Sequence, residues 1–139
     1  MAAPTPLEYI KWDGTRGCIR WIAQWTTGDQ FADQNLIDLD VDLAPVPTTV
    51  KIRTIDIIIN GNVRVDLEFD ATTDQLIDSF EGQTDVTHPL IRDYTDCPNV
   101  GLVPNDSTAA GFTGDILLTT TGAADGDEVN LLITFERSS

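Results

Sequence analysis

The sequence has few basic residues, and this shortage disfavours one large class of function. It holds 8 lysines and arginines against 23 aspartates and glutamates, a formal net charge of −15 in 139 residues. Nucleic-acid binding needs clustered lysine and arginine to neutralise phosphates, so we expect no nucleic-acid partner. The acidic excess suits a surface that must stay soluble at high local density, although any soluble acidic protein would show the same charge.

Long apolar runs and a cysteine framework are also missing. No segment approaches the roughly 20 apolar residues of a membrane span, and residues 1–6 (MAAPTP) have neither the basic nor the apolar region of a signal peptide. We therefore expect synthesis without membrane crossing and no membrane partner. Cys18 and Cys97 have no CxxC spacing, so we expect two separate reduced thiols, with a late disulfide left open.

Residues suited to catalysis are scarce. His88 is the only histidine, and it lies in a proline-containing segment without a serine nucleophile motif. Carboxylates such as Asp66 and Glu68 alternate with apolar residues, which predicts a solvated strand face. The acidic turn at 125–128 lacks full calcium-loop spacing, and a cation there stays an open question. We predict no enzyme, no catalytic residue, no metal site and no cofactor.

What the sequence does have is alternation of apolar and polar residues. Residues 111–137 predict a hairpin whose second strand points Val129, Leu131, Ile133 and Phe135 to one face, with its turn at 122–126. A second predicted hairpin runs from 51 to 69 through Asn60 and Gly61, a tight-turn pair. Residues 18–26 predict a strand with two tryptophans on one face, as core or, alternatively, as an exposed aromatic patch.

The remaining segments complete the prediction. Residues 30–43 predict a strand with Asp38, Asp40 and Asp42 on its solvated face, followed by a stiff linker, Ala44-Pro45-Val46-Pro47, between strands. Residues 72–82 are the one plausible helical turn, and residues 83–108 form a long proline-rich loop. Short strands with little helix predict a single all-β domain over 1–139, an antiparallel β-sandwich of jelly-roll-like type.

Two segments rich in turn-forming residues are the predicted partner contacts. One is an extended N-terminal arm at 1–7, which either docks on a neighbouring subunit or adds a strand to its own sheet. The other is the 83–108 loop, because long loops in structural proteins often make lattice contacts. The predicted contact residues are Pro4, Pro6, His88, Pro89, Tyr94, Pro98, Val103 and Pro104.

Two motifs carry a resemblance to a known group of proteins. They are Phe69-Asp70-Ala71-Thr72-Thr73-Asp74 and Gly111-Phe112-Thr113-Gly114-Asp115-Ile116-Leu117-Leu118-Thr119-Thr120-Thr121-Gly122. Over about residues 51–137 the chain resembles small structural proteins of tailed-bacteriophage virions. The resemblance implies a capsid decoration or cement subunit of the virion that is assembled in the host cytoplasm, binds the major capsid protein and copies of itself, and stabilises the head.

Two other functions fit the sequence. A neck or tail adaptor, or completion protein, would belong to the same virion but be present in far fewer copies. A carbohydrate-binding β-sandwich would instead stack Trp12, Trp21 or Trp25 on sugar rings, with nearby carboxylates binding hydroxyl groups.

Overall fold

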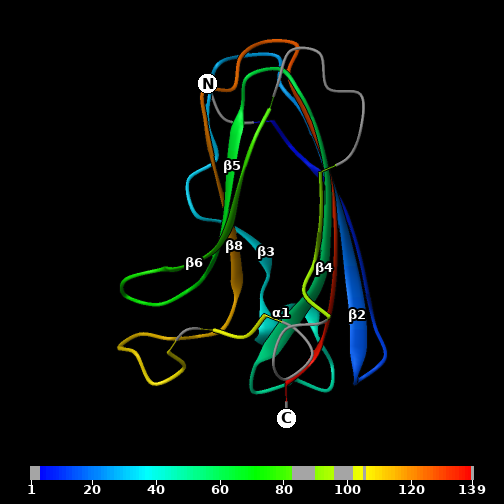
Figure 1. The fold of residues 1–139 in the computed structure, drawn as a ribbon, viewed down its shortest axis with the longest axis vertical. Coiled ribbons are helices and arrows are strands. Elements are labelled where there is room, and N and C mark those ends of the chain that lie inside the picture. The colour runs from blue at the N-terminus through cyan, green and yellow to red at the C-terminus, as the bar shows by residue number, and fades with distance from the viewer. Residues whose placement is uncertain (1–3, 83–89, 96–101, 105, 139) are drawn as a thin grey trace.

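The computed structural model describes residues 4–82, 90–95, 102–104 and 106–138. In them the chain forms two antiparallel sheets that face each other (Figure 1). Sheet A has the order β1-β2-β9-β4-β7, and sheet B has the order β3-β8-β5-β6. The elements are β1 Leu7–Trp12, β2 Arg16–Gln24, β3 Gln34–Ile37, α1 Leu39–Asp42, β4 Val50–Asn60, β5 Arg64–Phe69, β6 Gln75–Glu81, β7 Leu90–Asp93, β8 Ile116–Thr121 and β9 Glu128–Arg137. The predicted all-β antiparallel sandwich is confirmed.

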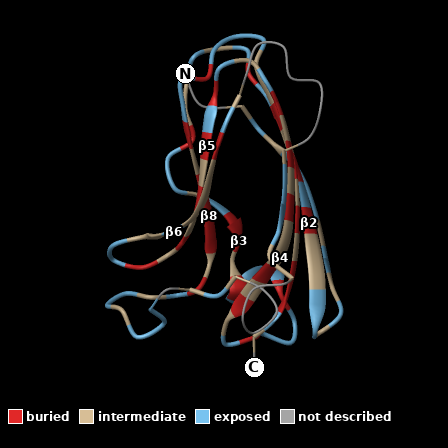
Figure 2. Ribbon diagram, in the orientation of Figure 1, coloured by how far each residue is buried: buried red, intermediate tan, exposed pale blue. Residues whose placement is uncertain are grey.

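The core lies between the two sheets, and buried residues alternate along the strands of both sheets (Figure 2). Trp21 is fully buried and Trp25 is 2% exposed, and both pack edge-on against Phe31 with ring centroids 5.2 and 5.7 Å away. The interpretation of these tryptophans as core residues is confirmed, and the alternative of an exposed aromatic patch is wrong for both.

Both predicted hairpins are wrong in their pairing. β4 lies in sheet A and β5 in sheet B, while β8 lies in sheet B and β9 in sheet A. The strands instead pair across the sequence, β4 with β9 and β5 with β8. Alternation identifies a strand and its buried face, but it does not name the neighbour. Residues 61–63 suffice to cross between sheets about 10 Å apart, because each residue spans up to about 3.5 Å.

The predicted strand at 30–43 is wrong after Ile37. β3 ends there, and Asp38 caps a short helix by accepting hydrogen bonds from the backbone N–H groups of Asp40 and Val41. An aspartate at this position satisfies N–H groups that a helix start leaves without partners. The Ala44–Pro45 peptide that follows is cis.

The predicted helical turn at 72–82 is also wrong, because residues 75–81 form β6 at the edge of sheet B. Leu76 is 63% exposed and Phe80 is buried, so the apolar residues expected to share one helical face do not share one environment on the strand. Pairing with β5 outweighs the weak helical pattern.

The 83–108 segment is not a loop throughout. Leu90–Asp93 forms β7, which pairs with β4, and Leu102 makes an isolated bridge to Ile52. At the N-terminus, Leu7 already belongs to β1, which pairs with β2 at the edge of sheet A. The chain therefore adds a strand to its own sheet, one of the two alternatives for this segment, and docking of residues 4–6 on a neighbour stays a prediction. In the described residues, no helix has the length and apolar character to cross a membrane.

Candidate interaction surface

The predicted contact residues do not gather in one place. Pro4 lies beside Leu7 and Ile22 near one end of sheet A, whereas Val103 lies beside Leu76 near the start of β6 in sheet B. Pro4, Pro6 and Pro104 are half-buried and Val103 is 39% exposed. His88, Pro89 and Pro98 lie outside the described residues, as does Cys97.

Tyr94, another predicted contact, is engaged within the chain. Its hydroxyl donates to a carboxylate oxygen of Asp78 on β6 at 2.6 Å, and its backbone N–H donates to the carbonyl of Arg53 on β4 at 2.8 Å. Tyr94 thus ties sheet A to sheet B, and its contact with a partner stays a prediction.

Exposed apolar side chains lie on the edge strands. Leu7 and Tyr9 on β1 are 59% and 63% exposed, Ile91 on β7 is 59% exposed, and Leu76 on β6 is 63% exposed. Proteins usually blunt a free sheet edge with charge or proline, because its unpaired backbone groups recruit other chains. These edges carry exposed apolar side chains next to charged ones such as Glu8, Lys11 and Arg92. Sequence reasoning missed this surface, since which strands lie at an edge depends on long-range pairing.

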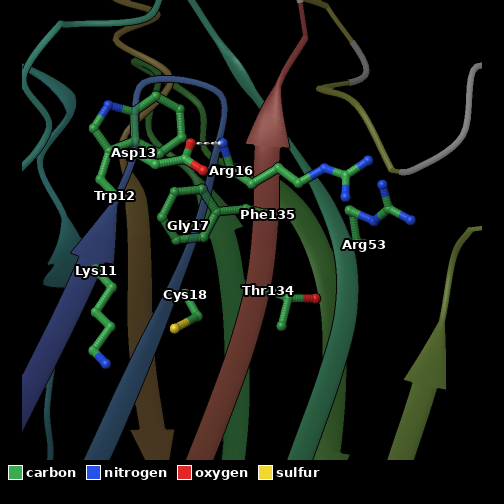
Figure 3. A pocket seen from close by; sticks show the side chains of 9 residues that line it. All are labelled: Lys11, Trp12, Asp13, Arg16, Gly17, Cys18, Arg53, Thr134 and Phe135. Atoms are coloured by element: carbon green, nitrogen blue, oxygen red, sulfur yellow. Dashed lines mark hydrogen bonds between the residues drawn. The ribbon is translucent and has the colours of Figure 1, made fainter.

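A pocket of about 480 Å³ opens at the end of sheet A where β1 turns into β2 (Figure 3). Trp12 and Phe135 stack at 5.7 Å with an angle of 16° between their rings, beside Gly17. A Cβ atom on Gly17 would lie 2.8 Å from the Phe135 ring, so the close packing here requires glycine. The pocket is lined by Lys11, Trp12, Asp13, Arg16, Gly17, Cys18, Arg53, Thr134 and Phe135.

Glu136 organises the positive charge beside this pocket. Its Oε2 binds Arg53 at 2.8 Å and Arg16 at 3.4 Å, and its Oε1 binds Lys51 at 3.2 Å. In Figure 3 the Arg16 side chain reaches across β9 towards Arg53. Burial alone would raise the pKa of Glu136, but hydrogen bonds and positive charge from Arg53 and Lys51 outweigh it, so its pKa is lowered. Three cations share one carboxylate, which leaves the cluster positively charged.

Sheet B carries the opposite charge. Asp33, Glu68 and Asp74 bring carboxylate oxygens within 4.8 Å of one another, the one such group among the residues that the structure describes. Burial and then the charges of Asp74, Asp33 and Asp66 raise the pKa of Glu68. Carboxylates at this spacing are suited to binding a hard cation, but exposed acidic groups are common without one. Within the described part of the chain, the 125–128 turn forms no comparable group.

The two motifs that carry the phage resemblance meet in the structure. The Thr113 hydroxyl donates to the Asp70 carboxylate at 2.7 Å, and backbone bonds join Asp70 to Asp115 and Thr72 to Ala110 at 2.9 Å. Gly111 has a φ of 69° and packs so closely on Thr72 that a Cβ would lie 2.3 Å from the Thr72 hydroxyl oxygen. The motifs therefore form one interlocked junction where β5 ends and β8 begins.

The tryptophans on which a sugar-binding function would depend are occupied. Trp21 and Trp25 lie in the core, and Trp12 is half-buried, with one ring face against Phe135 and its indole N–H donating to the Pro45 carbonyl at 3.0 Å. Trp21 and Trp25 are wrong as sugar-stacking candidates, and no open aromatic platform of the predicted kind is formed by these three residues.

No family model, curated protein or solved structure matches this chain in the comparisons made.

Proposed function

We propose that the chain is a structural subunit of a tailed-bacteriophage virion, which decorates the outer head and binds both the major capsid protein and copies of itself. The resemblance of the two motifs to virion proteins motivates the proposal. The structural observation that supports it is the exposure of Leu7, Tyr9, Leu76 and Ile91 on edge strands of both sheets. Such edges suit contacts with other protein chains.

The mechanism is physical. The sandwich offers a rigid body, and its edges make contacts with neighbouring subunits of the shell. Each contact is small, but a subunit that bridges two capsid proteins adds the second contact at high effective concentration. Bridging in this way would hold neighbouring capsomers together. The negative charge of −15 keeps a densely covered particle soluble.

The first test is the copy number of the chain in purified virions, measured by mass spectrometry with isotope-labelled standards. A count that scales with the major capsid protein supports the head assignment. A count matching one closed ring of subunits would favour the neck or tail alternative instead. Absence from the particle would overturn the virion assignment altogether.

A second test asks whether the edges make the contact. We expect Tyr9→Asp or Leu76→Asp to weaken binding to heads assembled without the chain by roughly tenfold, because a buried charge at a contact costs over about 1 kcal/mol. Val46→Asp is the matched control: Val46 is 47% exposed but lies in the segment between α1 and β4. Equal binding by all three variants and the wild type, measured by cosedimentation, would rule out the edges.

A further inference from the structure

The outer face of sheet A, which points away from sheet B, is sorted by charge. On β2, β9 and β4 the buried core residues alternate with residues that face outward. The strand register aligns these outward residues in rows that run across the sheet. In the strand order β1, β2, β9, β4 and β7, one row contains Tyr9, Arg20, Leu132, Asp56 and Ile91.

The next row along the strands has the same arrangement of charge. In the same strand order it contains Lys11, Cys18, Thr134, Thr54 and Asp93. The cations of both rows lie on β1 and β2, the carboxylates lie on β4 and β7, and β9 separates them. These two rows are therefore neutral in total, in a chain with a net charge of −15, and the face has a positive half and a negative half.

The side chains of the first row are available to a partner. Tyr9 and Ile91 at its ends are 63% and 59% exposed. Arg20 is exposed and Asp56 is half-buried, and within the described part of the chain neither of them forms an ion pair. A hollow of about 170 Å³ lies at these two residues and is also lined by Leu132, so the centre of the face has room for a partner side chain.

We propose that this face binds the same face of a second copy, around a two-fold axis that lies in the interface and runs along β9. A rotation about such an axis keeps each row in place and exchanges its ends. Arg20 then faces Asp56 of the second copy and Asp56 faces the second copy's Arg20, so two ion pairs form. Tyr9 packs on Ile91 in the same way, and Leu132 packs on Leu132 of the second copy.

The neighbouring rows obey the same rotation. Lys11 faces Asp93 of the second copy, and in the row on the other side of Leu132, Ile22 faces Ile58. Packed sheets lie about 10 Å apart and their strands cross at about 30°, so pairs far from the axis are displaced most. Arg20 and Asp56 lie one strand from β9, which makes their pairing the best test of the geometry.

Charge complementarity selects a second copy over other partners. A partner with charge of one sign, such as a phosphate backbone or a basic peptide, would match one half of the face and be repelled by the other. A second copy places an opposite charge on every charge of these two rows. The proposal deepens the self-association named in the proposed function and rests on it to that extent, but it does not need the particle to be a virion.

The interface is small. The three rows cover roughly 500 Å² on each copy, or about 1,000 Å² in total, which is in the range of weak interfaces. The charge of −15 on each copy opposes association at long range, but at about 0.15 M salt charges more than about 8 Å apart are largely screened. We therefore expect a dimer with a dissociation constant on the order of 0.1 mM.

Sedimentation equilibrium in reducing buffer, at up to about ten times this dissociation constant, tests the proposal. We expect the average mass of the wild type to rise towards that of a dimer. Arg20→Asp and Asp56→Arg should each weaken the dimer at least about tenfold, because each places like charges together at both pairs. An equimolar mixture of the two variants should dimerise again, since every aspartate of one variant then meets an arginine of the other.

Two variants with the same charge changes elsewhere are the matched controls. Arg64→Asp makes the first change on sheet B, and Asp125→Arg makes the second in the exposed turn between β8 and β9. Both change the net charge as much as the corresponding swap does. We expect each to alter the dissociation constant by less than about threefold, because these charges lie away from the interface.

Each result decides the proposal. It would be overturned by a wild type that stays monomeric, by a single swap that associates normally, by folded variants whose mixture stays monomeric, or by controls weakened as much as the swaps. Thermal unfolding reports whether each variant folds, and if one swap impairs folding, the other swap and its control still decide. A monomeric wild type would leave the virion copy number unaffected, and absence from the particle would leave the dimer unaffected, so the two failures are distinguishable.

Discussion

Two glutamates on the outer faces of the two sheets have opposite surroundings. Glu136 in sheet A binds Arg16, Lys51 and Arg53, and its pKa is lowered. Glu68 in sheet B stands with other carboxylates, and its pKa is raised. Each glutamate directly follows a buried apolar residue on its strand, Leu67 before Glu68 and Phe135 before Glu136. Their neighbours, which come from distant parts of the sequence, decide whether the negative charge stabilises the fold or opposes it.

The two sheets therefore hold their carboxylates in different ways. Sheet A surrounds one glutamate with cations. Sheet B and the segments beside it add neutral hydroxyl donors, as in the bonds from Ser79 to Asp66 at 2.6 Å and from Thr113 to Asp70 at 2.7 Å, and Asp66 also binds Arg64 at 3.1 Å. Hydroxyl donors thus serve some of the acids in a chain that places four of its eight basic residues around Glu136 and the neighbouring pocket.

The largest effect on stability should follow from removing the charge of Glu136, which binds Arg16, Lys51 and Arg53 on sheet A. We expect Glu136→Gln to lower the free energy of unfolding by about 2 kcal/mol at pH 7, because charge-assisted hydrogen bonds are lost and three cations keep no shared counterion. Urea unfolding measures it. Glu81→Gln is the control, since Glu81 is 75% exposed and 4.0 Å from Arg64, and should cost less than about 0.5 kcal/mol.

The pH dependence of this difference has a definite sign. Because the pKa of Glu136 is lower in the folded state than its ordinary value of 4.5, its contribution is complete above that value and is lost as the pH falls through the folded pKa. The two curves of stability against pH should therefore converge in acid. A gap that stays constant down to low pH would show that packing, and not charge, causes the loss.

Local patterns in the sequence identified the strands more reliably than their partners. The alternation at 129–135 and at 63–69 placed each buried residue on the correct face. On β9, Val129, Leu131, Ile133 and Phe135 are buried, whereas the residues between them are only half-buried. The pairing of β4 with β9 joins residues far apart in the sequence, which a local pattern does not encode. The same limit explains why both hairpins were wrong.

The cationic pocket was missed for a related reason. Lys11 lies on β1 and Arg16 on β2, whereas Lys51 and Arg53 lie on β4, and β9 between β2 and β4 brings Arg16, Lys51 and Arg53 to Glu136. Identifying the pocket required the strand order as well, because the same residues on non-adjacent strands would remain separate.

A smaller effect should come from the motif junction beside sheet B. We expect Thr113→Val to lower the free energy of unfolding by about 1 kcal/mol, since the hydrogen bond to Asp70 is lost while the side-chain shape is kept. Thr121→Val, at the exposed end of β8, should change stability by less than about 0.5 kcal/mol. Thermal and urea unfolding of both variants check this, and equal losses would assign no special role to the junction.

The smallest effect, of opposite sign, should come from relieving the acidic cluster of sheet B. We expect Glu68→Gln to raise the free energy of unfolding by about 0.5 kcal/mol at pH 7, because the like charges of Asp33, Asp66 and Asp74 lie close to Glu68 and repel it. The pKa of Glu68 is raised above its ordinary 4.5, so its favourable contribution is present below 4.5 and is lost as the pH rises through the folded value. The stability gain of Glu68→Gln should therefore appear only as the pH rises above the folded-state pKa of Glu68.

Asp125→Asn is the control, because it removes the same charge from an exposed turn. An equal gain there would mean that net charge, not the cluster, is responsible.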